Sequence, residues 1–332
     1  MEQTWHPGTL LRLSGSYWQA FALHAGVKLR IFSILASGAM TARTVAGRAE
    51  ADEAATARLL DALSAMALLS KKQDRYELSD AARRYLVEGA DEFIGYMILH
   101  HHYLAPSWTR LDEAVKLGKA VRRRASHGDD QEREAFLMGM FNQAMQQATA
   151  IADHIDLRRQ HKLIDLGGGP GTYAIHFCQK NPRLEAVVFD LPTTQPVAEK
   201  TIARFGLSQR IQFSAGDYLS DELPGQYDTA WLSHILHAQG PGECRNIIAK
   251  VVKVLSPGAK IFIHEFILTD TKDGPLYPTL FSLNMLLGTG EGRSYSQMEL
   301  VEILKSAGVT QIERTAYKGP TESGIIGGVI KK

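Results

Sequence analysis

The stretch LIDLGGGPGTY, from Leu163 to Tyr173, sets three consecutive glycines, and a fourth two positions later, behind a short apolar run that contains an acid. Glycine lets a backbone adopt left-handed dihedral angles and approach a ligand closely. In an open parallel sheet, ligands bind at the carboxyl ends of the strands, where the strand order reverses. The stretch therefore predicts a buried first strand followed by a loop that lies against a ligand.

Apolar runs separated by helical segments continue from this stretch to about residue 266. Such alternation is typical of a mostly parallel sheet that helices cover on both faces. The last residues, IERTAY and GIIGGVIKK around a Gly-Pro turn, predict a closing antiparallel hairpin. We expect an α/β fold with a doubly wound, Rossmann-like sheet, whose parallel strands are Leu163–Leu166, Ala186–Phe189, Ile211–Phe213, Thr229–Leu232 and Lys260–Phe266.

The chain before about residue 110 has a helical pattern instead. We expect residues 1–110 to form a separate helical domain, and residues 111–332 to hold linker helices and the α/β domain. Apolar residues at steps of three and four predict a buried helical stripe that consists of Phe21, Ala25, Leu29 and Phe32.

Polar residues mark the ends of several helices in this first domain. Thr41 and Asp52 are placed to cap the helices that follow them, and Ser79 to cap a later one. A turn near Gln73 precedes a short strand at Tyr76–Leu78. Helices followed by such a β-wing predict a winged-helix arrangement.

Winged-helix domains often bind DNA, so a ligand-sensing regulator is an alternative interpretation. The candidate recognition helix, about Glu53 to Leu69, carries one arginine, Arg58, and no lysine. Neutralising several phosphates needs several cations. The composition of this helix favours packing against a partner subunit over binding to DNA.

The composition is that of an ordinary globular enzyme, with 332 residues, 45% of them hydrophobic and 22% charged. The net charge of +1 directs the protein toward neither nucleic acid nor an anionic membrane. Cys178 and Cys244 lie far apart and give no disulfide framework or metal-knuckle spacing. We expect a cytoplasmic protein, because the sequence shows no export signal and no apolar run of about 18 residues.

The glycine stretch has the spacing D-x-G-x-G-x-G, formed by Asp165, Gly167, Gly169 and Gly171. A dinucleotide-binding loop reads G-x-G-x-x-G instead and seats a pyrophosphate on a helix N-terminus. The spacing resembles the loop of S-adenosylmethionine-binding proteins.

Two further acids follow the next two strands. Asp190, in VVFDLP, stands 23 positions after Gly167, where a carboxylate can accept both ribose hydroxyls of a nucleoside. Asp217, in SAGDYL, is placed to meet the adenine amino group. Either acid alone could be a loop-capping aspartate, but together with Asp165 they favour a nucleoside ligand.

Longer motifs occur in the order and spacing of one enzyme family: LIDLGGGPGTYAIHF, VVFDLP, AGDYL, SHILH, VLSPGAKIFIHEFIL and EGRSYSQMELVEILKSAG. They resemble the small-molecule O-methyltransferases related to caffeate, hydroxyindole and polyketide O-methyltransferases. RYELSDAARRYL and SWTRLDEAVKLGK resemble the N-terminal dimerisation domain and connector of that family, so the similarity covers nearly the whole chain.

The resemblance implies a reaction and a set of partners. The cofactor would be S-adenosyl-L-methionine, and its methyl group would pass, without a metal, to a phenolic or enolic hydroxyl of a hydrophobic small molecule. The protein would form a homodimer through its N-terminal domain, with the acceptor between the two domains. An alternative keeps the cofactor but uses its positive charge for decarboxylation, hydroxylation or rearrangement.

The family's general base is a histidine after the fourth strand, usually in Leu-His-Asp-Trp, and His237 takes that position in ILHAQGPGE. Ala238 and Gln239 replace the Asp-Trp pair, which leaves the non-methylating alternative open and predicts a wider pocket. His234, three positions earlier, is a second candidate for the base.

A histidine needs help to deprotonate a phenol. The pKa of a phenol is about 10 and that of imidazole about 6.5, which makes the proton transfer uphill by roughly 5 kcal/mol. A neighbouring carboxylate and a dry pocket narrow this gap. Glu265, in FIHEFIL, matches a family glutamate that flanks the base, and Glu291, in GTGEGRS, is a candidate second acid.

Three successive histidines, residues 100–102, could suggest a metal site. On a helix, however, they point about 100° apart and cannot converge on one metal ion.

The remaining candidates lie on a helix and in the loops that the resemblance assigns to the ligands. Met138 and Met145 belong to a helix that is either core or a cover over the ligands. Candidate cofactor contacts are Asp165, Gly167, Gly169, Gly171, Asp190, Leu191, Gly216, Asp217, Tyr218 and Ser233, and candidate acceptor contacts are His102, Met140, Phe141 and Asn284.

Overall fold

The computed structural model describes residues 4–123 and 129–331. The chain divides into two compact units that interleave in sequence. The N-terminal unit holds the chain up to Ala105 and the segment Asp130–Asn142, and the C-terminal unit holds Pro106–Asp129 and Gln143–Lys332.

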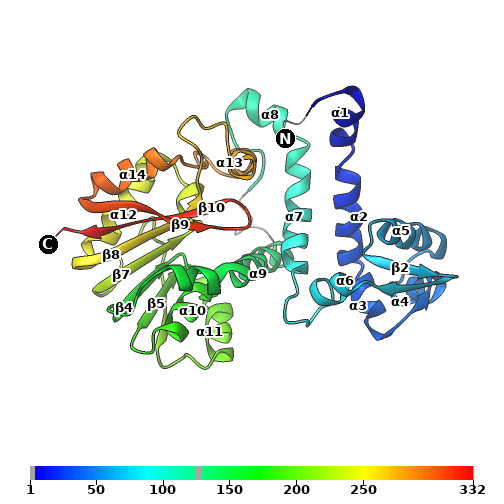
Figure 1. Cartoon of the computed structure of the whole chain (residues 1–332), viewed down its shortest axis with the longest axis horizontal. Coiled ribbons are helices and arrows are strands. Elements are labelled where there is room, and N and C mark those ends of the chain that lie inside the picture. Colours follow the sequence, from blue (N-terminus) through cyan, green and yellow to red (C-terminus); the bar gives the residue numbers. More distant parts are fainter. Residues whose placement is uncertain (1–3, 124–128, 332) are drawn as a thin grey trace. The chain divides into compact units, whose positions relative to one another are not determined.

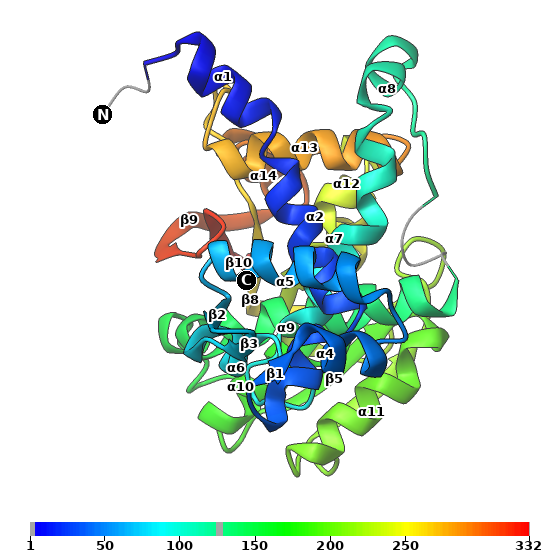
Figure 2. The ribbon, with the colours of Figure 1, turned by 90° about the vertical axis from the view of Figure 1, so that its right-hand side faces the viewer.

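The N-terminal unit is mainly helical and contains one small sheet with the strand order β1-β3-β2 (Figure 2). Its elements are α1 (Pro7–Ser14), α2 (Tyr17–Lys28), α3 (Ile31–Ile34), η1 (Leu35–Ser37), β1 (Met40–Thr41), α4 (Ala42–Arg48), α5 (Glu53–Ala65), β2 (Leu69–Lys72), β3 (Arg75–Leu78) and α6 (Asp80–Tyr85). The long helices α7 (Gly95–Trp108) and α9 (Asp130–His154) each contribute residues to both units.

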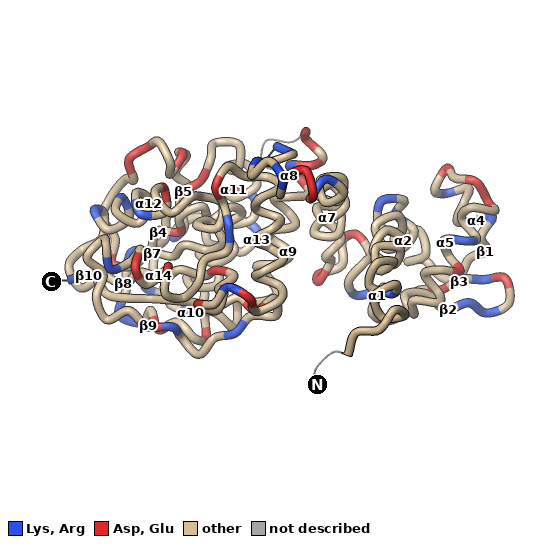
Figure 3. The backbone as a smooth tube through the Cα atoms, turned by 90° about the horizontal axis from the view of Figure 1, so that it is seen from above, with Lys and Arg blue, Asp and Glu red and all other residues tan. Residues whose placement is uncertain are grey.

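The predicted helix caps of this unit are confirmed. The side chains of Thr41, Asp52 and Ser79 accept backbone N–H groups at the starts of α4, α5 and α6. Strands β2 and β3 pair in an antiparallel hairpin whose turn contains Gln73 in the left-handed region. Lys and Arg stand beside Asp and Glu on this wing and on the helices next to it (Figure 3).

The predicted buried stripe on α2 is wrong in its phase. Phe21 and Leu29 are 43% and 40% exposed, and among the four predicted residues only Phe32 is buried. The buried positions are His24, Val27 and Ile31, again at steps of three and four, together with Gly26. Gly26 lies against Phe32 and Leu63, and a β-carbon there would stand 3.0 Å from Phe32 Cε2 and 3.2 Å from Leu63 Cδ1, so both side chains would have to shift. The inner face therefore combines His24 and Gly26 with Val27, Ile31 and Phe32, while Phe21 and Leu29 lie on the exposed face.

The C-terminal unit confirms the expected doubly wound sheet and its closing hairpin (Figure 1). The strand order is β6-β5-β4-β7-β8-β10-β9, in which β10 runs antiparallel to both of its neighbours. Its elements are α8 (Leu111–Leu117), β4 (Lys162–Leu166), α10 (Thr172–Lys180), β5 (Glu185–Asp190), η3 (Pro192–Thr194), α11 (Gln195–Arg204), β6 (Ile211–Ala215), β7 (Tyr227–Ser233), η4 (Leu236–Ala238), α12 (Pro241–Lys253), β8 (Leu255–Phe266), α13 (Leu276–Gly288), α14 (Gln297–Ser306), β9 (Val309–Lys318) and β10 (Ser323–Ile330).

Helices cover both faces of this sheet with apolar side chains. One core cluster joins the strands to α12 and α14, and a second joins them to α10, α11 and the end of α9. Burial on both faces explains why β4 and β7 are mostly apolar rather than alternating between apolar and polar residues. The reversal of strand order between β4 and β7 places the glycine loop where ligands bind in such sheets.

Within the described residues, no single helix is both long enough and apolar enough to span a membrane. One bent pair of helical segments, Pro7–Lys28 and Ile31–Ser37, reaches that length and apolarity only when the two are taken together.

Candidate active site

Three glycines of the loop after β4 have left-handed φ angles, 63° at Gly167, 54° at Gly169 and 79° at Gly171. Side chains are disfavoured in this region of dihedral space. A β-carbon at Gly167 would also stand 2.6 Å from Cγ2 of Ile235. At Gly169, by contrast, no heavy atom of the described chain other than those of Gly169 and its two neighbours lies within 4 Å of the β-carbon position. The loop therefore turns the backbone of Gly169 toward open space, the side on which a ligand fits.

Asp165 supports the loop from beneath. Its side chain is fully buried, and Oδ2 accepts the backbone N–H of Ala174 at 3.3 Å. Gly168 leaves room for it, because a β-carbon there would lie 2.6 Å from the Asp165 carboxyl carbon. Burial raises the pKa of Asp165 to about 7. In this conformation Asp165 holds the loop and the start of α10 rather than facing a ligand.

Asp190 stands at the carboxyl end of β5, against the same loop. Its carboxylate accepts the N–H of Gly169 at 2.8 Å, the N–H of Leu191 at 2.7 Å and the hydroxyl of Thr194 at 3.2 Å. Burial raises the pKa of Asp190, and these donors act in the opposite direction. The carboxylate is thus held in one orientation beside the open face of the loop.

The end of β6 brings three more candidates to this edge of the sheet. The N–H of Gly216 donates to the carbonyl of Asp190 at 2.9 Å, and half-buried Asp217 follows it. The ring of Tyr218 lies 3.5 Å from the β-carbon position of Gly167. The glycine loop and the ends of β5 and β6 therefore meet in one place, as the sequence predicted.

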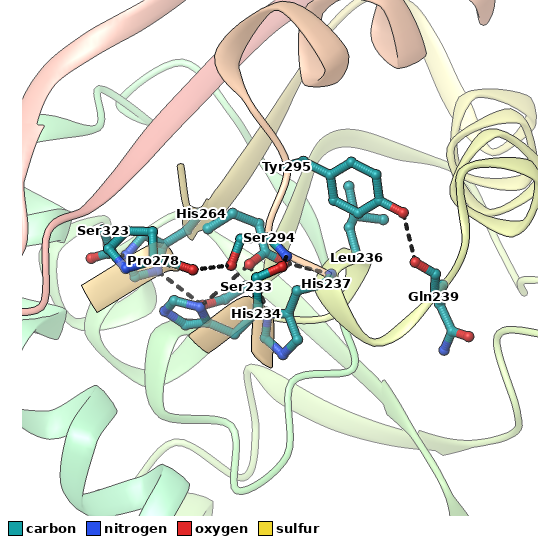
Figure 4. A network of polar contacts seen from close by, with 12 residues as sticks. Ser233, His234, Leu236, His237, Gln239, His264, Pro278, Ser294, Tyr295 and Ser323 are labelled. Carbon is teal, nitrogen blue, oxygen red and sulfur yellow. Dashed lines mark hydrogen bonds and ion pairs between the residues drawn. The ribbon is translucent and has the colours of Figure 1, made fainter. Parts of the chain in front are cut away.

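Ser233, the last residue of β7, belongs to a buried polar chain. Its hydroxyl lies 3.0 Å from Nδ1 of His264, whose Nε2 lies 3.0 Å from the hydroxyl of Ser323 (Figure 4). Burial lowers the pKa of His264 well below its ordinary value, so the ring is neutral. This chain fixes the end of β7 against β8 and β10.

His237 and Glu265 form a close pair that is almost fully shielded from solvent. Nδ1 of His237 lies 2.7 Å from Oε2 of Glu265, and the backbone N–H of His237 donates to Oε1 at 3.2 Å. The two side chains are 11% and 2% exposed. Burial alone would raise the pKa of Glu265, but His237 and His234 hold it below its ordinary value. The carboxylate is therefore ionised and fixes the orientation of the His237 ring.

Aromatic rings surround this pair. The ring of Phe281 meets the His237 ring edge-on at a centroid distance of 4.8 Å, and the Phe266 ring lies nearly parallel to it at 6.2 Å. Phe266 also contacts Phe281 at 4.5 Å and Tyr277 at 5.1 Å. The pair consequently faces an aromatic wall built from β8 and α13.

His234 lies beside the pair rather than within it. Its Nδ1 is 3.6 Å from Oε2 of Glu265, and its ring centroid is 5.9 Å from that of His237. Burial lowers the pKa of His234, although Glu265 opposes this shift. The ring nearest to the carboxylate is therefore that of His237.

The cluster of His234, His237 and Glu265 could also be considered as a metal site, because its ligand atoms all lie within 4.8 Å of one another. Around tetrahedral zinc, bonds of about 2.0–2.2 Å put neighbouring ligand atoms roughly 3.3 Å apart. His237 Nδ1 and Glu265 Oε2 are closer than this, at 2.7 Å, which is the distance of a charge-assisted hydrogen bond. In this conformation His237 and Glu265 share a proton in a hydrogen bond. That the reaction needs no metal stays a prediction.

The segment that replaces the family's Asp-Trp pair is held by other groups. Gln239 is 1% exposed, and its carbonyl accepts the hydroxyl of Tyr295 at 2.6 Å (Figure 4). The thiol of Cys244 donates to the carbonyl of Leu236 at 3.3 Å. Tyr295 and Cys244 thus hold the turn that carries His237.

The other predicted residues are distributed over both units. Glu291 is exposed, and its side chain lies over Gly240, where a β-carbon would stand 2.0 Å from Oε2. Asn284 is buried in the C-terminal unit, and its Oδ1 accepts a guanidinium N–H of Arg122 at 3.3 Å. His102, half-buried in the N-terminal unit, lies 3.1 Å from Lys28 Nζ. Met140 and Phe141, also half-buried, belong to that unit as well.

The sequence reasoning missed the aromatic wall and the buried histidine behind it. His264 and Phe266 flank Glu265 in FIHEFIL, so the signal for them was their position beside a candidate site residue. Phe281 and Tyr295 carried no signal of this kind, because only the fold brings α13 and the segment before α14 to β8.

Comparison with known proteins agrees with this geometry. Residues 112–310 match the family model of an O-methyltransferase domain, and residues 11–88 match that of an O-methyltransferase dimerisation domain. The chain is 33% identical, over 97% of its length, to 3-hydroxy-5-methyl-1-naphthoate 3-O-methyltransferase of Streptomyces sahachiroi, 95% of which is covered. It is also 33% identical to the N,N-dimethyltransferase OxyT of Streptomyces rimosus, over 92% of each chain.

A solved structure, PigF with SAH, has a TM-score of 0.89 at 25% identity and covers 98% of this chain and 100% of that one. The expected family and its cofactor, S-adenosyl-L-methionine, are thereby confirmed. The chain belongs to the S-adenosylmethionine-dependent O-methyltransferase family.

Proposed function

We propose that the enzyme methylates a phenolic or enolic hydroxyl of a hydrophobic small molecule, with His237 as the general base. The observation that carries the proposal is the 2.7 Å contact between His237 and the buried carboxylate of Glu265. Ile235, two residues before His237, packs against Gly167, so the base and the glycine loop belong to one continuous site.

His237 and Glu265 have different roles in the proposed proton transfer. Glu265 accepts the Nδ1–H of His237, which leaves the lone pair of Nε2 available for the proton of the acceptor hydroxyl. The carboxylate then stabilises the imidazolium that forms, and the dry surroundings strengthen this interaction. The remaining barrier is geometric, because the acceptor oxygen must be held about 3 to 3.5 Å from the methyl carbon.

We assign the cofactor to the edge formed by the glycine loop, Asp190 and Asp217. The open space beside Gly169 admits the nucleoside without a side chain in the way. Asp190 would accept the ribose hydroxyls, and Asp217 would meet the adenine amino group, with Leu191, Tyr218 and Ser233 nearby. When bound there, S-adenosylmethionine supplies an electrophilic methyl group on a good leaving group.

The wall of Phe266, Phe281 and Tyr277 supports a flat aromatic acceptor, because rings pack favourably on rings. The names of the two relatives point to acceptors of different kinds, a hydroxynaphthoate in one and an amine in the other. The position of a base beside the wall favours a hydroxyl here. The relatives' names also favour methyl transfer over decarboxylation, hydroxylation or rearrangement.

Assembly and location complete the proposal. The N-terminal domain, residues 1–110, would join two copies into a homodimer, and residues 111–332 would carry the reaction, with acceptor contacts from Met140, Phe141, His102 and Asn284. The buried free thiols of Cys178 and Cys244 fit the reducing cytoplasm.

Two variants separate binding from chemistry. Calorimetric titration with S-adenosylmethionine and S-adenosylhomocysteine should give micromolar binding that collapses in Asp190→Ala, while Asp190→Asn, which keeps the acceptor of the Gly169 N–H, should retain part of it. His237→Gln should bind both ligands normally but lose about 10²- to 10⁴-fold in kcat for labelled methyl transfer.

The acceptor panel for this assay contains phenols, naphthols and aromatic amines. His161→Gln is the matched control, because the His161 side chain is 63% exposed outside the site. Full turnover by His237→Gln would remove the base assignment. Turnover of amines alone would replace oxygen by nitrogen as the acceptor atom.

A further inference from the structure

His234 adopts a conformation that costs energy. Its φ angle is 56°, in the left-handed region that few residues other than glycine visit, although asparagine, aspartate and histidine do so more often than the rest. Its backbone N–H donates to the carbonyl of His264 at 2.9 Å, directly after β7 ends. Strain of this kind at a half-buried position calls for a reason in the surroundings of the side chain.

The side chain is clamped between two rings. The His234 ring centroid lies 4.4 Å from that of Phe266 and 4.4 Å from that of His264. Only 15% of the side chain is exposed. The ring therefore cannot swing toward solvent without breaking both contacts.

Neither ring nitrogen of His234 meets a hydrogen-bond partner at ordinary distance among the described residues. The nearest acceptor is Oε2 of Glu265, 3.6 Å from Nδ1. The same oxygen lies 2.7 Å from Nδ1 of His237, so one carboxylate oxygen faces two imidazoles. Buried polar groups that lack a full partner are rare and commonly functional.

The other titratable groups around His234 leave Glu265 as its one charged neighbour in the described chain. On β8 it faces Glu265 and His264, and on η4 it faces His237. The two nitrogens of His264 are occupied by Ser233 and Ser323. Burial lowers the pKa of His234, so its neutral ring carries a single N–H near pH 7.

We propose that His234 is a positioning residue that directs its Nδ1–H at Oε2 of Glu265 and so limits how much of the carboxylate's charge acts on His237. This inference rests on the proposed role of His237 as the base. At 3.6 Å the His234 N–H acts on this oxygen as a nearby dipole rather than through a hydrogen bond, and it offsets part of the negative charge that His237 experiences. Removal of the His234 donor therefore leaves the whole charge to His237, which then holds a proton to higher pH.

Three substitutions tolerate the left-handed backbone and differ in what they offer to Glu265. His234→Asn keeps a short N–H donor, His234→Gly removes the side chain, and His234→Asp has the shape of asparagine but adds a negative charge. Because asparagine and aspartate have nearly the same shape, their comparison separates the donor from packing even where glycine disturbs the fold.

The first measurement is the pH dependence of kcat/KM with labelled S-adenosylmethionine and a phenolic acceptor from the panel. The acid limb of the profile should move upward by about 0.5 to 1 pH unit in His234→Gly and in His234→Asp, and should stay at the wild-type position in His234→Asn. A second readout needs no acceptor: nuclear magnetic resonance of histidine-labelled protein with S-adenosylhomocysteine follows the His237 ring, identified by its loss in His237→Gln.

The outcomes distinguish this inference from the function on which it rests. An acid limb that stays in place in both His234→Gly and His234→Asp, or that moves equally in His234→Asn, would overturn the role of His234. An acid limb retained in His237→Gln would instead overturn the base assignment. Titration with S-adenosylhomocysteine, which should give the same affinity within about twofold, verifies that each variant is folded.

Discussion

At the scale of single residues, the site depends on buried carboxylates that the fold treats differently. Glu265 accepts hydrogen bonds from the backbone N–H and the Nδ1–H of His237, so its carboxylate stays ionised although only 2% of the side chain is exposed. Asp165 is fully buried with a single backbone donor, the N–H of Ala174. The first arrangement stabilises the ionised form and the second disfavours it.

Asp165 should consequently give stability a measurable pH dependence. Burial raises the pKa of Asp165 to about 7, above the 3.8 of the unfolded chain. Its contribution to stability is therefore fully present below pH 3.8 and is lost as the pH rises through about 7. Asp165→Asn keeps an oxygen for Ala174 and cannot ionise, so it should gain stability over wild type with rising pH, on the order of 4 kcal/mol at pH 8.

Urea unfolding of both proteins at pH 5 and pH 8 tests this, and the advantage of Asp165→Asn should grow by about 2.6 kcal/mol between the two pH values. Glu302→Gln, an exposed acid on α14, is the control and should show no such trend. A constant difference between Asp165→Asn and wild type across this range would mean that Asp165 is already ionised in the folded protein.

At the scale of elements, β8 explains how the site is held. Successive side chains of a strand point to opposite faces, so His264 joins the polar chain of Ser233 and Ser323 while Glu265 turns to His237. The β8 register against β7 pairs Ser233 with His264 and thus brings the turn after β7 next to Glu265. One strand therefore fixes the carboxylate and the ring stack behind it.

Helix α5 allows a test of local capping in the N-terminal unit. The Asp52 carboxylate accepts the N–H of Ala55 at 2.8 Å and satisfies a donor that has no partner within the helix. Asp52→Ala should lower the stability of this unit by about 1 kcal/mol, and Asp52→Asn, an equally good cap, should leave it within about 0.3 kcal/mol of wild type.

Hydrogen exchange of the α5 amides reports the opening of this unit without interference from the C-terminal one. Equal protection in Asp52→Ala and wild type would show that tertiary packing, rather than the cap, decides the stability of α5.

At the scale of the whole molecule, the N-terminal helices α1 and α2 expose a group of large apolar side chains. The exposed residues on and beside α1 and α2 are Trp5 (50%), Leu10 (52%), Leu11 (73%), Leu13 (58%), Tyr17 (56%), Trp18 (70%) and Phe21 (43%). Each of the two helices carries a single cation and no acid, Arg12 in α1 and Lys28 in α2. An apolar surface of this size and this low charge is typical of a subunit interface.

Trp18→Glu should therefore weaken the dimer. A buried, unpaired carboxylate in an interface costs several kcal/mol, enough to raise the dissociation constant at least about 100-fold. Sedimentation velocity over a range of concentrations measures this change. Met298→Glu, at a residue that is 54% exposed on α14, is the control for added charge. A Trp18→Glu protein that sediments like wild type at every concentration would place the dimer contact elsewhere.

The sequence by itself determined the elements whose signals are local. The glycine spacing, the apolar strands and the caps at Thr41, Asp52 and Ser79 depend on dihedral freedom, periodicity and short-range hydrogen bonds, so the doubly wound sheet, the wing and the family could be predicted. The position of His237 and its glutamate followed from the family's motifs.

The tertiary structure decided which face of each element is covered and what gathers around the base. Periodicity gave the steps of the α2 stripe, but only packing against Leu63 and Phe32 selected the face with His24 and Gly26. Phe281 came to lie against His237, and His234 against Glu265, through the arrangement of α13, β7 and β8. Such contacts join residues far apart in the chain, and their energies depend on distances that no local pattern encodes.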